Sequence, residues 1–217
     1  MERMQDFFSA RLDGYEEQML EHVEGCREAY RELVQYLPEN CKRLLDLGCG
    51  TGLELEEIWN DQPQVQVTGI DLTQSMLDRL RQNYPDRTIR LICGDYFTVP
   101  FENAAYDAAV SVQTMHHFSH EAKVGLYKKI LAALQPGGVY IECDYMVEKQ
   151  EEEDFFAAEN ARIRRELGIS QSDFYHFDTP CTMQNQIRLL YAAGFAHVEQ
   201  VFRKGNTTIV VAQREEK

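Results

Sequence analysis

The chain lacks a long apolar run and a closely spaced cysteine pair among its 217 residues. No apolar run approaches the ~18 residues that a membrane-spanning helix needs. The opening residues, Met1 to Asp6, contain no apolar core of a secretion signal. None of the six cysteines forms a Cys-x-x-Cys pair, which argues against a zinc or redox site. We therefore expect a cytoplasmic protein with reduced cysteines and without a bound metal.

The chain is also poor in basic side chains, with 22 Lys and Arg against 36 acids and a net charge of −14. Nucleic-acid binding depends on Lys and Arg contacts to phosphates, and anionic membranes attract basic segments. The acidity therefore argues against both partners and favours a neutral or cationic small molecule. The length suits one domain, and no internal repeat divides it. We expect a single domain over residues 1–217, as a monomer or homodimer.

The most informative segment runs from Leu44 to Gly52 and reads as a buried strand, a glycine-rich turn and the start of a helix. Glycines at alternate positions let the backbone turn tightly and approach a ligand closely. The helix that follows would present unpaired N–H groups to that ligand. The next apolar segment ends in Asp71, where a carboxylate can accept both ribose hydroxyls of a nucleoside.

Strand and helix patterns alternate from this segment to about residue 145, which predicts parallel strands with right-handed crossovers. Strands are expected at 44–47, 65–71, 89–93, 106–112, 139–143, 196–203 and 207–212. Helices are expected at 16–37, 53–60, 73–83, 119–134, 150–167 and 182–193. Thr73 is placed to cap the third of these helices. Residues 204–206, Lys-Gly-Asn, join the last two strands into an antiparallel hairpin.

In their order, these segments resemble the class I S-adenosylmethionine-dependent methyltransferases that act on small molecules. The matching features are the segment Asp46 to Gly52, the acids Asp71 and Asp95, the strand at Tyr106-Asp107 with the trailing pair His116-His117, and the turn Leu134 to Gly138. The resemblance implies an α/β, Rossmann-like, seven-stranded and mostly parallel sheet in the order 3-2-1-4-5-7-6, with helices on both faces. It also implies an N-terminal helical cap, residues 1–38, and a helical lid inserted after the fifth strand, residues 146–180.

The resemblance further implies that the chain binds S-adenosylmethionine and releases S-adenosylhomocysteine. Asp46 would order the glycine loop and, directly or through water, the amino-acid ammonium. Asp71 would accept from the ribose hydroxyls, and Asp95 would accept from the adenine amino group. The expected cofactor-binding residues are Asp46, Gly48, Cys49, Gly50, Gly52, Asp71, Leu72, Met76, Asp95, Tyr96, Gln113, Tyr15 and Arg11.

Methyl transfer needs the acceptor and the methyl group held in line and shielded from water, so it does not require many acids and bases. We expect Gln113 and His117, which follow the fourth strand, to be the catalytic candidates. A metal site from the histidine pair and His120 is disfavoured, because adjacent side chains point apart. The residues expected to meet the acceptor are His116, His117, Glu142, Asp144, Tyr145 and His176.

Other functions remain open at this point. A nicotinamide oxidoreductase would carry a glycine where Leu53 stands. Methyltransferases that act on amino groups of DNA carry Pro-Pro and an aromatic residue after the fourth strand, where this chain has Ser111 to Thr114. An RNA-modifying methyltransferase and a non-catalytic S-adenosylmethionine-binding or interaction protein stay as alternatives. The sequence favours transfer to an unidentified small molecule.

Overall fold

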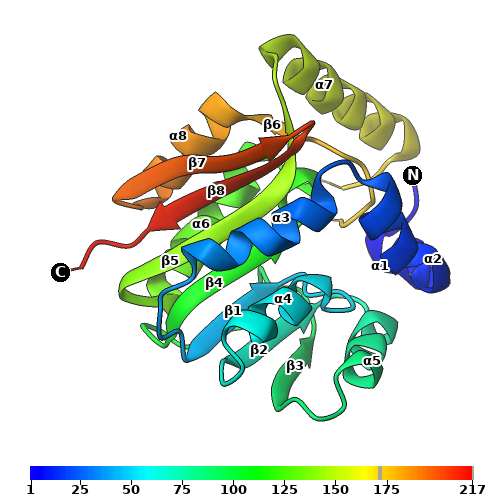
Figure 1. Ribbon diagram of the computed structural model, residues 1–217. Helices are drawn as coiled ribbons and strands as arrows, with labels where there is room; N and C mark the ends of the chain where they lie inside the picture. The colour runs from blue at the N-terminus through cyan, green and yellow to red at the C-terminus, as the bar shows by residue number, and fades with distance from the viewer. Residues whose placement is uncertain (171–172, 217) are drawn as a thin grey trace.

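The computed structural model describes residues 1–170 and 173–216, and its chain folds around one mixed sheet (Figure 1). The strand order is β3-β2-β1-β4-β5-β8-β7, with the short β6 beside β5. The strands are β1 (Arg43–Leu47), β2 (Gln66–Asp71), β3 (Ile89–Cys93), β4 (Tyr106–Val112), β5 (Leu134–Val147), β6 (Cys181–Thr182), β7 (His197–Lys204) and β8 (Thr207–Gln213). Only β8 runs antiparallel to its neighbours, β5 and β7. The predicted sheet order is confirmed, and β6 is an addition that the sequence did not predict.

Helices cover both faces of this sheet (Figure 1). One face packs against α3, α4 and α5, and the other packs against α6 and α8. The helices are α1 (Met4–Ala10), α2 (Leu12–Glu17), α3 (Cys26–Leu33), α4 (Leu53–Asp61), α5 (Gln74–Asn83), α6 (His120–Ala133), α7 (Gln150–Leu167) and α8 (Met183–Ala193). Single-turn helices are the π-helix Gln18–His22 and the 3₁₀ helices Val34–Tyr36 and Met115–His117. Among the described residues, no helix is both long and apolar enough to cross a membrane.

Alternation along β1 decides which side chains enter each apolar core. Leu45 and Leu47 belong to the core beneath α6 and α8, whereas Leu44 belongs to the core beneath α3 and α4. Successive side chains of a strand point to opposite faces of its sheet. Asp46 therefore shares the face of Leu44 and lies on the side of α4, a placement that bears on its role below.

The prediction of one helix over 16–37 is wrong. The chain passes through α2 and the π-helix, breaks at Val23, and starts again as α3 at Cys26. Gly25 at the break has a φ of +79°, which residues with a side chain rarely adopt. A Cβ atom there would also lie 2.8 Å from Cβ of Lys204, so the close approach of the β7–β8 hairpin requires glycine.

Two smaller expectations also need correction. The segment from Leu134 to Gly138, predicted as a turn, lies within β5, where Leu134 pairs with Tyr106 and the register shifts before Ala108. Thr73 does precede α5, but its side chain makes no capping hydrogen bond.

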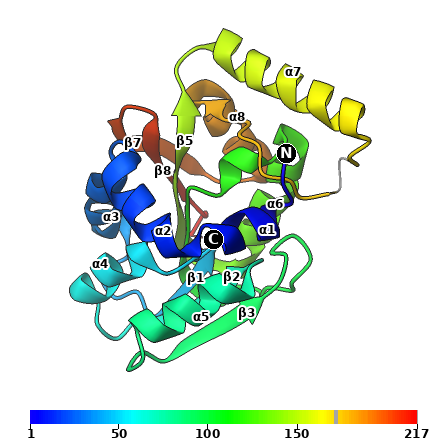
Figure 2. The same cartoon turned by 90° about the vertical axis from the view of Figure 1, so that its right-hand side faces the viewer.

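The N-terminal segment pairs with the segment that follows α7. Arg3 and Tyr175 form an antiparallel bridge, Met4 N donates to Phe174 O at 3.1 Å, and His176 N donates to Glu2 O at 3.0 Å. In Figure 2, α1 and α2 lie in front of the sheet, while α7 projects from the rest of the chain. Two segments far apart in sequence therefore meet over the same region of the fold.

Lys129 on α6 holds the loop that follows β3. Its ammonium donates to the carbonyl oxygens of Tyr96, Phe97 and Val99, at 2.7, 3.0 and 2.5 Å. We expect Lys129→Met to lower the free energy of unfolding by ~1–3 kcal/mol, because partly buried carbonyls lose a charged donor. Urea unfolding measures this effect. Lys128→Met, at the exposed neighbouring position, should change stability by no more than about 0.5 kcal/mol, and an equal loss in both variants would contradict the assignment.

Candidate functional site

The glycine loop between β1 and α4 forms the floor of the site. Gly48 and Gly50 have φ angles of +73° and +48°. Gly48 N donates to Ile70 O at 2.8 Å, and Gly50 N donates to Oδ2 of Asp71 at 3.0 Å. A Cβ atom on Gly48 would lie 2.8 Å from Oγ1 of Thr114, so the loop passes close beneath the segment that follows β4. The loop is thereby hydrogen-bonded to the end of β2 and packs closely against the segment after β4.

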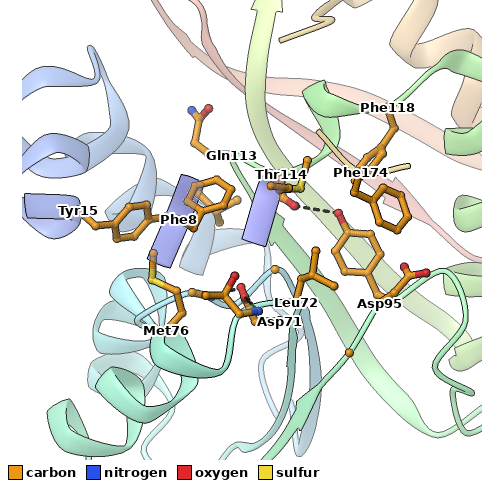
Figure 3. A pocket seen from close by; sticks show the side chains of 17 residues that line it. Phe8, Tyr15, Asp71, Leu72, Met76, Asp95, Gln113, Thr114, Phe118 and Phe174 are labelled. Atoms are coloured by element: carbon orange, nitrogen blue, oxygen red, sulfur yellow. Dashed lines mark hydrogen bonds between the residues drawn. The ribbon is translucent and has the colours of Figure 1, made fainter. Parts of the chain in front are cut away.

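A first cavity opens above this loop (Figure 3). Figure 3 shows Tyr15, Phe8 and Met76 at one end, Asp95, Phe118 and Phe174 at the other, and Asp71 with Leu72 between them. The cavity holds about 60 Å³. It is lined by Met4, Phe8, Tyr15, Gly48, Gly50, Asp71, Leu72, Thr73, Met76, Gly94, Asp95, Tyr96, Val112, Gln113, Thr114, Phe118 and Phe174.

The two acids of this cavity are fixed by backbone N–H groups. Asp71 accepts from Thr73 N through Oδ1, at 2.8 Å, in addition to its bond from Gly50. Burial raises the pKa of Asp71, and these two backbone donors oppose the rise. Asp95 accepts from Phe97 N through Oδ1, at 2.8 Å. A carboxylate has about four acceptor sites, so both acids keep capacity for a ligand hydroxyl or amino group.

Asp46 lies beneath the loop and does not line the cavity. Burial, followed by the charge of Glu54, raises its pKa well above the usual range. Burial also raises the pKa of Glu54, in the first turn of α4, to about 7. The two carboxyl groups therefore hold a proton under the glycine loop. Sequence reasoning missed Glu54, although an acid in the first turn after a glycine loop was a usable signal.

Two further residues predicted to bind the cofactor support the loop from below. Cys49 is buried, and its Sγ would lie 2.8 Å from a Cβ atom added at Gly69. Gly52 precedes α4 with a φ of +79° and faces Leu80. Neither lines the first cavity, so their place in the structure is to shape the turn.

A second cavity of about 720 Å³ adjoins the first and shares Phe8, Tyr15 and Gln113 with it. Gln113 has a φ of +51°, which is uncommon for a residue with a side chain and typical of functional sites. Its Nε2 is buried and finds no hydrogen-bond partner among the described residues. The other lining residues are Phe7, Arg11, Gly14, Gln18, Met19, Val23, Glu24, His116, His117, Tyr145, His176, Asp178, Asn206 and Thr207.

The histidines after β4 lie together in this cavity, and the expectation that adjacent side chains point apart is wrong here. The ring centroids of His116 and His117 are 4.0 Å apart. Burial lowers the pKa of His116, but the adjacent carboxylate of Asp144 outweighs it, so the pKa is raised. Burial, followed by the charges of His116 and His176, lowers the pKa of His117 well below its usual value. His117 is therefore neutral at neutral pH.

The acceptor residues predicted from the sequence divide into two groups. His116, His117, Tyr145 and His176 line the second cavity. Glu142 and Asp144 are buried in the sheet beside it.

The carboxylate of Glu142 accepts from Tyr127 and Tyr140, at 2.7 and 3.0 Å. Glu142 therefore does not line the cavity that was expected to hold the acceptor. Asp144 accepts from Nδ1 of His116 and acts through that ring. Arg11 lines the second cavity instead of the first and pairs with Glu2 at 2.9 Å. Asp178, which the sequence analysis missed, also lines the second cavity.

Comparison with known proteins finds methyltransferase relatives. A family model described as a methyltransferase domain matches residues 44–138, from β1 into β5. Carboxy-S-adenosyl-L-methionine synthase of Helicobacter pylori is 27% identical over 196 residues, which cover 84% of this chain and 81% of that protein. A 24-methylenesterol C-methyltransferase 2 of Oryza sativa is 29% identical over 132 residues, 58% of this chain and 35% of that protein.

Solved structures of methyltransferases share the fold of this chain. The human N-acetylserotonin methyltransferase, solved in complex with S-adenosylmethionine, superposes with a TM-score of 0.63 at 17% identity. The match covers 86% of this chain, which spans about half, 51%, of that protein. The family model over residues 44–138 and these relatives support a class I S-adenosylmethionine-dependent methyltransferase, an enzyme of the family that the sequence resembles.

Proposed function

We propose that this chain transfers the methyl group of S-adenosylmethionine to a small molecule, with the cofactor in the first cavity and the acceptor in the second. The observation that carries this proposal is the junction of the two cavities at Phe8, Tyr15 and Gln113. In-line transfer requires the acceptor atom, the methyl carbon and the sulfur to be aligned in a site without water. Two adjoining cavities that share lining residues meet that requirement.

The residues of the first cavity suggest how the cofactor would be held. Asp71 would accept from the ribose hydroxyls, Asp95 from the adenine amino group, and Tyr15 would cover the methionine end. Gly48 and Gly50 leave the backbone open to the ligand, while Asp46 acts indirectly by supporting the loop. S-adenosylhomocysteine would leave from the same cavity after transfer.

We assign entry and closure to the cap, residues 1–38, and to the lid, residues 146–180, of which 171 and 172 lie outside the described residues. The first cavity holds about 60 Å³, which is less than the roughly 300 Å³ at the small end of ligand pockets. Phe8 of the cap and Phe174 of the lid both line it. The cofactor would therefore displace these side chains on entry, and the pairing of Arg3 with Tyr175 would let both segments move together.

A polar acceptor suits the second cavity. Three histidines and Asp178 line it, and the orphaned amide of Gln113 reaches it. These groups favour an acceptor with oxygen or nitrogen donors over an entirely apolar one. The second candidate function is modification of S-adenosylmethionine itself, favoured by the match to the synthase over 84% of this chain.

Calorimetric titration with S-adenosylmethionine, S-adenosylhomocysteine and NADH tests the proposal. We expect micromolar binding of the first two ligands and no binding of NADH. A screen of small acceptors followed by mass spectrometry then distinguishes a methylated acceptor from a modified cofactor. Failure of both sulfur ligands to bind would refute the cofactor assignment.

With the acceptor from that screen, we expect His117→Ala to lower turnover by about 10²-fold or more. Cofactor affinity should stay within twofold, because His117 does not line the first cavity. Steady-state kinetics and titration of the same preparation measure both quantities. Full turnover in this variant would remove His117 from the reaction.

A further inference from the structure

Three histidine rings and one carboxylate lie close together in the second cavity. Oδ1 of Asp178 lies 3.6 Å from Nε2 of His116 and 3.5 Å from Nδ1 of His117. Nε2 of His176 lies 4.0 Å from the same oxygen. The ligand atoms of His116, His117 and Asp178 all lie within 4.8 Å of one another.

These distances are too long for direct hydrogen bonds, which span about 2.7–3.2 Å between nitrogen and oxygen. Nδ1 of His117 and Oδ1 of Asp178 are both buried and have no hydrogen-bond partner within the described part of the chain. Buried polar atoms without partners are costly, so their convergence suits a ligand that would bond both atoms. Two atoms that each lie about 2.1 Å from one metal ion at tetrahedral angles are about 3.4 Å apart, close to the separations found here.

In both His116 and His117, the ring nitrogen on the side away from the proposed ligand has a hydrogen-bond partner, as is usual for metal-binding histidines. Nδ1 of His116 bonds Oδ1 of Asp144 at 2.5 Å, which leaves Nε2 for the cavity. His117 bonds the backbone of Phe177, and its Nδ1 remains unpartnered. A carboxylate or a backbone carbonyl on the far nitrogen fixes the tautomer and the orientation of a ligating ring. The rings are thus set for a ligand in the cavity.

We propose that Nε2 of His116, Nδ1 of His117 and a carboxylate oxygen of Asp178 bind a divalent transition-metal ion beside the methyl-transfer site, with His176 within reach as a fourth ligand. Two imidazoles and a carboxylate suit Zn²⁺, Fe²⁺ or Co²⁺ and leave coordination positions open. These positions face a cavity that also contains Gln113 and Tyr15.

The metal gives the proposed acceptor a definite chemistry, and this step rests on the proposed function. A hydroxyl oxygen of the acceptor would occupy an open position, and the ion would lower the pKa of that hydroxyl. The O–H proton would pass to solvent, and the oxygen would form a bond to the methyl carbon. The bond from that carbon to sulfur would break with its electron pair on sulfur, which gives S-adenosylhomocysteine and an O-methylated product.

A second cluster, His120, Glu153 and Cys181, is the rival site. Its ligands already have partners: Nε2 of His120 lies 2.8 Å from Glu153, and the ammonium of Lys123 lies 3.2 Å from Sγ of Cys181. Glu153 also accepts from Asn185 at 2.8 Å. A lysine cation beside a potential thiolate ligand opposes metal binding at this cluster. The cluster is therefore a network of hydrogen bonds and ion pairs.

Titration of the tag-free, chelator-treated chain with Zn²⁺ and Co²⁺ tests the metal site without any methyl acceptor. We expect about one equivalent of metal per chain, and a Co²⁺ absorption spectrum of nitrogen and oxygen ligands without a thiolate charge-transfer band. His117→Ala and Asp178→Asn should each weaken Zn²⁺ binding more than 100-fold. Asp144→Asn should weaken it about 10- to 100-fold through the orientation of His116.

Matched variants make the result specific. His197→Ala, on an exposed part of β7, and His120→Ala, in the rival cluster, should leave Zn²⁺ affinity within twofold. The melting temperature of each variant checks its fold independently of both ligands. Absence of stoichiometric Zn²⁺ binding, or its retention in His117→Ala, would overturn the proposal, as would a thiolate band that Cys181→Ser removes. Metal binding without any S-adenosylmethionine binding would instead refute the proposed function and leave the metal site standing.

Discussion

Asp71→Ala is expected to weaken S-adenosylmethionine binding by about 10- to 100-fold, or ~1–3 kcal/mol. The carboxylate does two things at the end of β2. It accepts from Gly50 N and Thr73 N, at 3.0 and 2.8 Å, and thereby joins the glycine loop to the start of α5. It also lines the first cavity, where it would accept charge-assisted bonds from the ribose. Its removal would loosen the loop and delete the proposed ribose contact.

Calorimetry on the natural chain, Asp71→Asn and Asp71→Ala separates these contributions. Asn keeps one acceptor oxygen but loses the charge, so its affinity should fall between the other two. Asp61→Ala, an exposed acid at the end of α4, serves as the matched control and should bind normally. Wild-type affinity in Asp71→Ala would exclude the ribose assignment.

Glu54→Gln is expected to stabilise the cofactor-free chain at about pH 8 by roughly 2–3 kcal/mol. Burial raises the pKa of Glu54 to about 7 in the folded chain, from 4.5, so the folded state holds this proton more tightly than the unfolded state. The free energy of unfolding therefore falls as pH rises from about 4.5 to about 7, and the full cost remains above that range. A neutral amide cannot ionise, and it can donate to the carboxylate of Asp46.

Urea unfolding at about pH 5 and about pH 8 checks this prediction. The variant should gain little at the lower pH, where Glu54 of the natural chain is protonated and carries no charge. It should gain most of its advantage at the higher pH, where that carboxyl group is ionised. Glu56→Gln, at an exposed position of the same helix, should show no such difference. A gain that is equal at both pH values, or a loss at pH 8, would contradict the shared-proton interpretation of Asp46 and Glu54.

The elements of the sheet could be predicted because each carries its own periodicity and termination signals. Helix α7 was predicted over its observed range, Gln150–Leu167, where acids begin it; the structure ends it at Gly168 in the left-handed conformation. The long N-terminal helix was predicted wrongly, because an apolar stripe continues through Gly25 although the backbone turns there. The contact of Gly25 with Lys204, which favours the break, joins distant parts of the chain, so sequence periodicity could not predict it.

The site was predicted in part for the same reason. Acids and glycines at the carboxyl ends of neighbouring parallel strands meet, so Asp71, Gly48 and Gly50 could be placed together from topology, and the family resemblance added Asp95. The family resemblance put Asp46 beside the cofactor, whereas strand alternation turned its side chain under the loop toward Glu54.

By itself, the sequence determined the parallel core, the glycine loop and the acids at the strand ends, because these follow from local periodicity and strand order. Only the tertiary structure decided which polar groups meet in the second cavity. His116 and His117 follow β4, Asp144 lies in β5, and His176 and Asp178 come from the segment after α7. Their convergence depends on how that segment folds back and pairs with the N-terminal residues. Contacts of this kind lie far apart in sequence and leave no local pattern, so they appear only once the chain is folded.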